Sequence, residues 1–158
     1  LTAVMNRRGT MEHLQHYYSM AKRYNVPISV ALLDLDGFKL VNDREGHQVG
    51  DEVLRRFARL LGSTCRASDI VGRIGGDEFF VVMPHTNADQ AIAAMERCRE
   101  ALQRSEISTR STGNVLSISV GVAEVNSTIV DADDLFRRAD EATYAAKNEG
   151  KNRVRLAA

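Results

Sequence analysis

The pattern of apolar and polar positions switches between helical and strand periods along the chain. Apolar residues recur at helical spacing over residues 6–24, in a segment that ends near residue 62, over 87–105, and after Asp133, whose side chain can cap the last helix. Short, β-prone apolar runs lie at 28–34, 69–74, 79–84, 116–122 and 152–156. This order predicts an α+β fold with a central mixed, mainly antiparallel sheet of about five strands, flanked by helices.

Residues 73–80 read RIGGDEFF and join two of the predicted strands as a hairpin. Gly75 and Gly76 fall where the hairpin reverses, and we expect glycine there because tight hairpin turns demand a positive φ. Asp77 and Glu78 place two negative charges side by side at the start of a buried strand. Because acids are common at turns, this stretch alone leaves a solvated turn as an open alternative.

Asp34, Asp36 and Asp43 form a second acidic segment. Asp34 ends an apolar strand, where α/β sheets bind ligands, and strand alternation puts Asp36 on the same side. If this strand lies beside the hairpin, Asp34 meets the acids of the turn. Asp34 and the two acids of the turn would then give three carboxylates around one pocket. Such a set, without His or Cys ligands, suits Mg²⁺ or Mn²⁺. A pair of these ions can activate an attacking hydroxyl and stabilise a leaving oxygen. Alternatively, these acids cap helices or pair with Lys39 and Arg44.

Composition limits the class of molecule. The chain has 158 residues, of which 44% are hydrophobic and 27% charged, as expected for one soluble domain spanning residues 1–158. Lys+Arg and Asp+Glu balance at 21 each. The chain therefore has no excess of positive charge that would indicate binding to nucleic acid. Cys65 and Cys98 lack metal-site spacing and indicate a reducing, cytoplasmic compartment. There is no membrane-length apolar run, so we expect no membrane contact from this domain.

The chain opens without a starting Met. We therefore expect it to be the C-terminal part of a longer, regulated protein, whose other segments could include a membrane anchor or a sensor.

Four ordered motifs resemble the GGDEF-type diguanylate cyclase domain. Gly-Gly-Asp-Glu-Phe occurs literally at 75–79, and DLDGFKLVNDREGHQVGDEVL at 34–54 resembles the family's Asp-x-Asp-x-Phe-Lys…Asn-Asp…Gly-His…Gly-Asp stretch. LTAVMNRR and RRADEATYAAKNEGKNR resemble its opening and closing motifs. The resemblance covers essentially the whole chain. It implies a palm-like nucleotidyl-cyclase fold and an enzyme that joins two GTP into cyclic di-GMP, releasing two pyrophosphates, at a site between the two domains of a homodimer.

The resemblance also implies roles for individual residues around the metal. Asp34 and the backbone carbonyl of Leu35 resemble metal ligands. Asp77 resembles the catalytic acid that also binds metal, and Glu78 the adjacent acid of the metal site. Two Mg²⁺ (or Mn²⁺) ions per active site are expected. Phe79 is expected to pack in the core.

The substrate groups are assigned in the same way. Asn42 and Asp51 resemble the guanine readers, since a carboxylate can accept from guanine N1–H and N2–H₂ together and adenine lacks that pair of donors. His47 matches a further position near the base, with a structural histidine as the alternative.

The triphosphate is expected to meet the turn and the last helix. Gly75 and Gly76 let the backbone approach the phosphates. Lys147 and Lys151 resemble the pair that faces the β- and γ-phosphates, a role that suits point charges on flexible stems. The alternative for both lysines is a solvated helix end, where cations favour the helix dipole.

Arg66 and Asp69 resemble the family's RxxD inhibitory site, which binds the product cyclic di-GMP. Arg97 falls where the family often places a second arginine. Arginine can form bidentate hydrogen bonds to guanine or phosphate, and aspartate can accept hydrogen bonds from guanine N–H groups. The alternative is a surface ion pair, which contributes little to stability.

Three positions depart from the family's motifs: Ala3 replaces a glycine, Thr143 a leucine and Lys151 an arginine. None removes a predicted metal ligand or guanine reader, so the sequence favours an active enzyme. The rivals are a catalytically silent domain that senses cyclic di-GMP through Arg66 and Asp69, a cyclase that uses adenine nucleotides, and a purely structural dimerisation domain.

Overall fold

Five helices and five strands follow one another in the computed structural model, which describes residues 2–105, 107 and 116–158. Leu1 of the opening motif lies outside these residues. The helices are α1 (Arg7–Tyr24), α2 (Phe38–Glu45), α3 (His47–Thr64), α4 (Ala88–Arg104) and α5 (Ala132–Asn148). The strands are β1 (Ile28–Asp36), β2 (Ile70–Arg73), β3 (Glu78–Pro84), β4 (Ser117–Glu124) and β5 (Arg153–Leu156).

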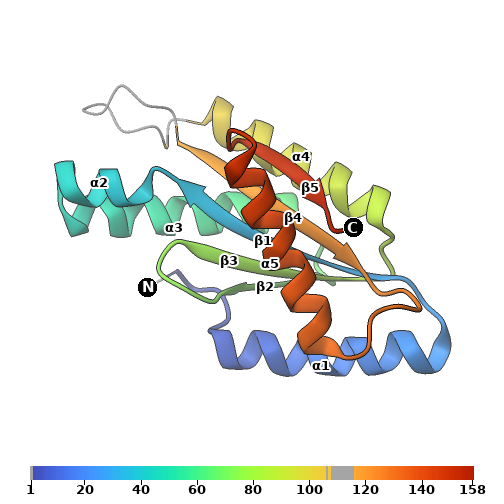
Figure 1. Ribbon diagram of the computed structural model, residues 1–158. Coiled ribbons are helices and arrows are strands. Elements are labelled where there is room, and N and C mark those ends of the chain that lie inside the picture. The colour runs from blue at the N-terminus through green and yellow to red at the C-terminus, as the bar shows by residue number, and fades with distance from the viewer. Residues whose placement is uncertain (1, 106, 108–115) are drawn as a thin grey trace.

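The strands form one sheet in the order β2-β3-β1-β4-β5 (Figure 1). The pairs β2–β3, β3–β1 and β1–β4 are antiparallel, and β5 joins β4 in parallel after the crossover through α5. The predicted mixed, mainly antiparallel sheet is therefore confirmed, and β5 is an edge strand as expected.

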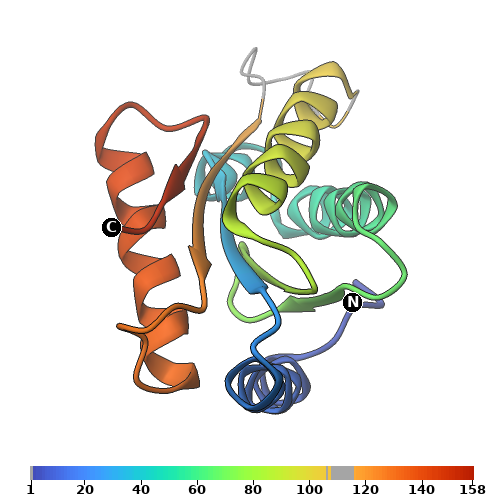
Figure 2. The same cartoon turned by 90° about the vertical axis from the view of Figure 1, so that its right-hand side faces the viewer.

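Helices cover both faces of the sheet. In Figure 2 the sheet is seen edge-on, with α5 on one side and α3 and α4 on the other. Ala31, Leu33 and Leu35 of β1 pack in the cluster that includes α3 and α4, whereas Val30 and Leu32 pack with α1 and α5. Because β1 is buried on both faces, its sequence is apolar throughout. The same alternation turns its last two acidic side chains toward α5.

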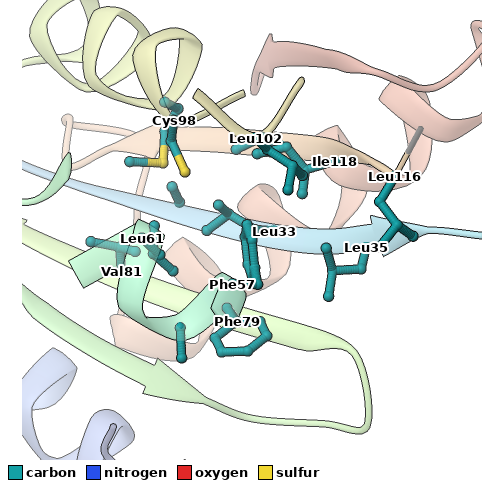
Figure 3. Close-up of a cluster of buried hydrophobic side chains, with 14 of the residues drawn as sticks. Leu33, Leu35, Phe57, Leu61, Phe79, Val81, Cys98, Leu102, Leu116 and Ile118 are labelled. Atoms are coloured by element: carbon teal, nitrogen blue, oxygen red, sulfur yellow. The ribbon is translucent and has the colours of Figure 1, made fainter. Parts of the chain in front are cut away.

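The core between the sheet and α3 is closed by an aromatic pair (Figure 3). Phe79 is fully buried and meets Phe57 edge to face, with ring centroids 5.0 Å apart and an interplanar angle of 77°. This geometry is favourable for aromatic rings and anchors the start of β3 beside α3. The predicted packing role of Phe79 is confirmed.

Three local predictions were wrong. The helix α2 was not anticipated, because only Phe38 and Val41 in it are buried and eight residues carry too little periodicity to be read. β1 continues two residues beyond the predicted end, to Asp36. The cap of α5 is Asp131 rather than Asp133, since it is the Asp131 side chain that accepts from a backbone N–H of the first turn.

Candidate active site

The end of β1 and the hairpin turn lie side by side at the same end of the sheet (Figure 1). Asp34 and Glu78 are directly opposed in the antiparallel register, and the Leu35 N–H donates to the Asp77 carbonyl at 3.2 Å. The sequence predicted that Asp34 would meet the acids of the turn if the two strands were neighbours. Strand pairing brings these segments together as predicted.

The hairpin turn is built differently from the prediction, because neither Gly75 nor Gly76 has a positive φ. The turn is wider than a two-residue hairpin: Ile74 N–H donates to the Glu78 carbonyl, and the Arg73 guanidinium donates to the Gly76 carbonyl at 2.7 and 3.1 Å. Gly75 is needed for space, since an added Cβ would lie 2.3 Å from a carboxylate oxygen of Glu78. An added Cβ on Gly76 would meet nothing within 4 Å, so this glycine leaves open room beside the turn.

Asp34 is buried and pairs with the α5 residue Lys147, whose Nζ lies 2.7 Å from Oδ2. Burial raises the pKa of the Asp34 carboxyl; the hydrogen bond from Lys147 lowers it in part, and the charges of Asp77 and Glu78 raise it again. Burial lowers the pKa of the Lys147 amine, but the hydrogen bond to Asp34 and the negative charges around the amine together outweigh burial and leave that pKa raised. Lys147 lies in the last turn of α5, as the alternative of a helix end supposed, but its ammonium is ion-paired rather than surrounded by solvent alone.

The predicted metal ligands do not form a closed cage. Within the described residues, no three His, Cys, Asp or Glu side chains lie close enough together to hold a metal ion. The chemistry of the donor set nevertheless fits a hard divalent cation, because every candidate ligand is an oxygen. Burial is the main reason that the pKa of Asp34 stays raised, and the nearby charges of Asp77 and Glu78 add to the rise, so three carboxylates lie close enough to interact electrically.

An open cleft of about 590 Å³ gathers five of the predicted residues: Asp34, Leu35, Asp77, Lys147 and Lys151. The side of α2 that faces this cleft contributes further residues that the sequence analysis did not assign to substrate. Among them are Lys39 and Asp43, which are four positions apart and so share one helix face. If the helix had been recognised in the sequence, this spacing would have predicted that both side chains lie on the same side of α2.

Asn42, His47 and Asp51 lie on α2 and α3, outside the lining of this cleft. Asn42 Oδ1 is buried without a hydrogen-bond partner and packs on Gly50, where an added Cβ would lie 1.9 Å from it. His47 is exposed at the start of α3, so it is not a core histidine, and Asp51 is half-buried one turn further on. The predicted base readers therefore form a second cluster, joined to the cleft through α2.

Arg66 and Asp69 form the turn between α3 and β2. Asp69 Oδ2 accepts from the backbone N–H of Arg66 at 2.7 Å. Burial raises the pKa of the Asp69 carboxyl, whose Oδ1 is buried without a partner. Burial also raises the pKa of Cys65 to about 12, with Asp69 adding to this rise and Arg97 opposing it. Asp69 and Arg97 therefore both lie near enough to the Cys65 thiol to shift its pKa.

The family model described as "Diguanylate cyclase, GGDEF domain" matches residues 1–153. This chain belongs to the GGDEF diguanylate cyclase domain family. The probable diguanylate cyclase DgcC of Escherichia coli is 41% identical over all 158 residues, and the chain spans 42% of that relative's length. The active GGEEF domain of a diguanylate cyclase from Vibrio cholerae has a similar structure, with a TM-score of 0.91 and 32% identity over 98% of both chains.

A third GGDEF domain, that of DgcB from Caulobacter crescentus in complex with c-di-GMP, also has a TM-score of 0.91, with 32% identity over 98% of this chain and 92% of that one. Within the described residues, no helix has the length and apolarity needed to cross a membrane.

The three residues that depart from the GGDEF motifs differ in their local structure. Ala3 takes φ 56° and Lys151 takes φ 63°, both in the left-handed region that favours glycine. Thr143 is buried, and its hydroxyl lies 3.0 Å from the Leu32 carbonyl oxygen and 2.9 Å from that of Ala139. The threonine therefore satisfies its polar group internally.

Proposed function

We propose that this chain is the catalytic domain of a diguanylate cyclase that joins two GTP into cyclic di-GMP. The observation that carries the proposal is the convergence of Asp34, Asp77, Lys147 and Lys151 on one cleft, with Glu78 opposite Asp34 in the sheet. A cluster of carboxylates beside two cations is suited to a substrate that carries a metal-bound triphosphate. Relatives named diguanylate cyclases support the same reading.

In the proposed reaction, the ribose 3′-oxygen of each GTP attacks the α-phosphorus of the other. One O3′–P bond forms and one bond to pyrophosphate breaks at each centre, so two pyrophosphates leave. The Asp77 carboxylate accepts the proton of the attacking hydroxyl, while Lys147 and Lys151 hold the charge of the β- and γ-phosphates. Gly76 leaves room for the phosphates beside the turn. Most of the acceleration would come from positioning and from charge stabilisation.

Two Mg²⁺ or Mn²⁺ ions per site are part of this proposal. Asp34, the Leu35 carbonyl, Asp77 and Glu78 would hold them. When bound, they would supply Lewis-acid stabilisation of the phosphate charge. With Asp34 serving as a metal ligand, the Lys147 ammonium would be available to the triphosphate.

The guanine base is assigned to the cluster on α2 and α3. The buried, unpartnered Oδ1 of Asn42 is an acceptor that a base N–H could satisfy. Asp51 would accept from guanine N1–H and N2–H₂, and His47 would lie near the base. Substitution of Asp51 by Ala should therefore reduce the preference for GTP over ATP.

Each domain would present one GTP, so the active unit is a homodimer. Turnover should then rise faster than linearly with protein concentration.

We also propose that the chain is one part of a longer, regulated protein that works in the cytoplasm, where GTP is found. The chain spans only 42% of DgcC, which supports the proposal of a longer protein.

Product inhibition is assigned to Arg66, Asp69 and Arg97. The unpartnered Oδ1 of Asp69 and two exposed arginines fit the donors and acceptors of a guanine nucleotide. Substitution of Arg66 by Ala should relieve inhibition by cyclic di-GMP, whereas Arg104→Ala, on an exposed residue of α4, should not. Inhibition unchanged in both variants would move the regulatory site elsewhere.

In the decisive experiment, the purified domain is incubated with GTP and Mg²⁺ at high protein concentration, and the products are separated by chromatography. Asp77→Asn is the test variant, and Asp140→Asn, on an exposed face of α5, is the matched control. Cyclic di-GMP from the wild type and the control, but not from Asp77→Asn, is expected. A silent wild type is then fused to a dimeric coiled coil. If that version is also silent but binds cyclic di-GMP, the chain is a receptor and the proposal is overturned.

A further inference from the structure

Asp36 links three parts of the chain that are distant in sequence. Its carboxylate accepts from the hydroxyls of Ser117 and Ser119 at 2.7 and 2.8 Å and from the backbone N–H of Asn152 at 3.2 Å. It therefore reaches across β4, from the end of β1 to the residue before β5. These donors, rather than Lys39 or Arg44, satisfy the carboxylate.

The residues that Asp36 reaches form an unusual turn. Three successive residues of this turn have a positive φ: 113° at Gly150, 63° at Lys151 and 47° at Asn152. Asparagine tolerates this region, but lysine does not favour it. The turn persists because the surrounding structure holds it, and Lys151 in its middle lines the cleft.

A second tether comes from α4. Arg99 Nη1 lies 3.3 Å from the side-chain oxygen of Asn152, and its Nε donates to Glu96 at 2.7 Å. The Arg99 side chain is only 19% exposed, so this guanidinium is fixed rather than free in solvent. Asn152 is thus held through its backbone by Asp36 and through its side chain by Arg99.

From this geometry we propose that Asp36, Arg99 and Asn152 are positioning residues that hold the left-handed turn and so aim Lys151 at the triphosphate. The inference rests on the proposed function, because it takes the cleft to be the GTP site. Its physical basis is that a flexible lysine stem loses less freedom on binding when its backbone is already fixed. None of the three needs to touch the substrate.

The test measures binding of the Mg²⁺ complex of an α,β-methylene GTP analogue by calorimetry. Asn152→Gly keeps a turn-compatible backbone and removes the contact with Arg99. Arg99→Gln removes the same contact from the other side, and Arg104→Gln on the same helix is its matched control. Lys151→Met, alone and combined with Asn152→Gly, completes a double-mutant cycle.

We expect Asn152→Gly and Arg99→Gln to weaken analogue binding by about three- to tenfold and Arg104→Gln to leave it unchanged. The double variant should bind no more weakly than Lys151→Met alone, because the tether acts through Lys151. Unchanged binding in both tether variants, or additive losses in the cycle, would overturn this inference alone. A wild-type chain that does not bind the analogue would overturn the proposed function together with it.

Discussion

The ion pair between Lys147 and Asp34 yields the most direct test of the site's electrostatics. Replacement of Lys147 by Met keeps most of the side-chain volume and removes the ammonium that lies 2.7 Å from a buried carboxylate. Breaking a fully buried pair costs about 3–5 kcal/mol. The Lys147 side chain is 35% exposed, so water screens the pair, and we expect a loss of about 1–2 kcal/mol in the free energy of unfolding.

The loss should depend on pH in a defined direction. Because the folded-state pKa of Asp34 is raised, the folded protein holds its proton more tightly than the unfolded chain. The cost of burying this carboxylate is therefore complete at neutral pH and disappears as the pH falls through the raised pKa. Without the hydrogen bond from Lys147 that pKa rises further. The destabilisation should thus be larger at about pH 7.5 than at about pH 4.5.

Urea unfolding followed by circular dichroism, without metal or nucleotide, measures this effect. Lys151→Met is the matched control, since Lys151 is an exposed cation of the same cleft. In an Asp34→Asn background, Lys147→Met should cost little, because no buried charge is left without a partner. Equal losses in both lysine variants, or the same loss with and without Asp34, would mean that the ion pair does not stabilise the fold.

Three further predictions concern packing, backbone strain and thiol reactivity. Gly121→Ala should destabilise the fold by about 3 kcal/mol or more, since the new Cβ would lie 2.1 Å from a backbone oxygen of α5. Its control, Gly62→Ala in α3, places a Cβ that meets nothing within 4 Å and should stabilise the fold by about 0.5–1 kcal/mol, and equal effects of the two variants in urea unfolding would contradict this. Ala3→Gly should stabilise by about 1 kcal/mol in the same assay, because φ 56° strains alanine; a loss would mean that this strain is absent. Burial raises the pKa of Cys65 to about 12 and of Cys98 to about 11, so both should react at least about a hundredfold more slowly with a thiol reagent than free cysteine, and fast labelling of the folded chain would disagree.

Much of the fold could be predicted because its signals are local. The helical spacing around Leu14 and Tyr18 and the doubly buried run of β1 each depend on near neighbours in the chain, and the structure has these elements with small shifts at their ends. The short helix α2 was missed because two buried residues do not establish a period. The cap of α5 was misplaced by two residues, since several acids there are chemically equivalent.

The site was predictable in its chemistry and less so in its geometry. The carboxylates, the lysines and their motif spacing are local features of the sequence, and they predicted a metal-bound nucleotide as the ligand. Other features depend on the three-dimensional arrangement: Lys147 bonds Asp34 across 113 positions, the bulk of Glu78 requires Gly75, and Asp36 accepts from the backbone of Asn152. These contacts join segments far apart in the chain, so they depend on strand register and helix packing, which no local pattern encodes.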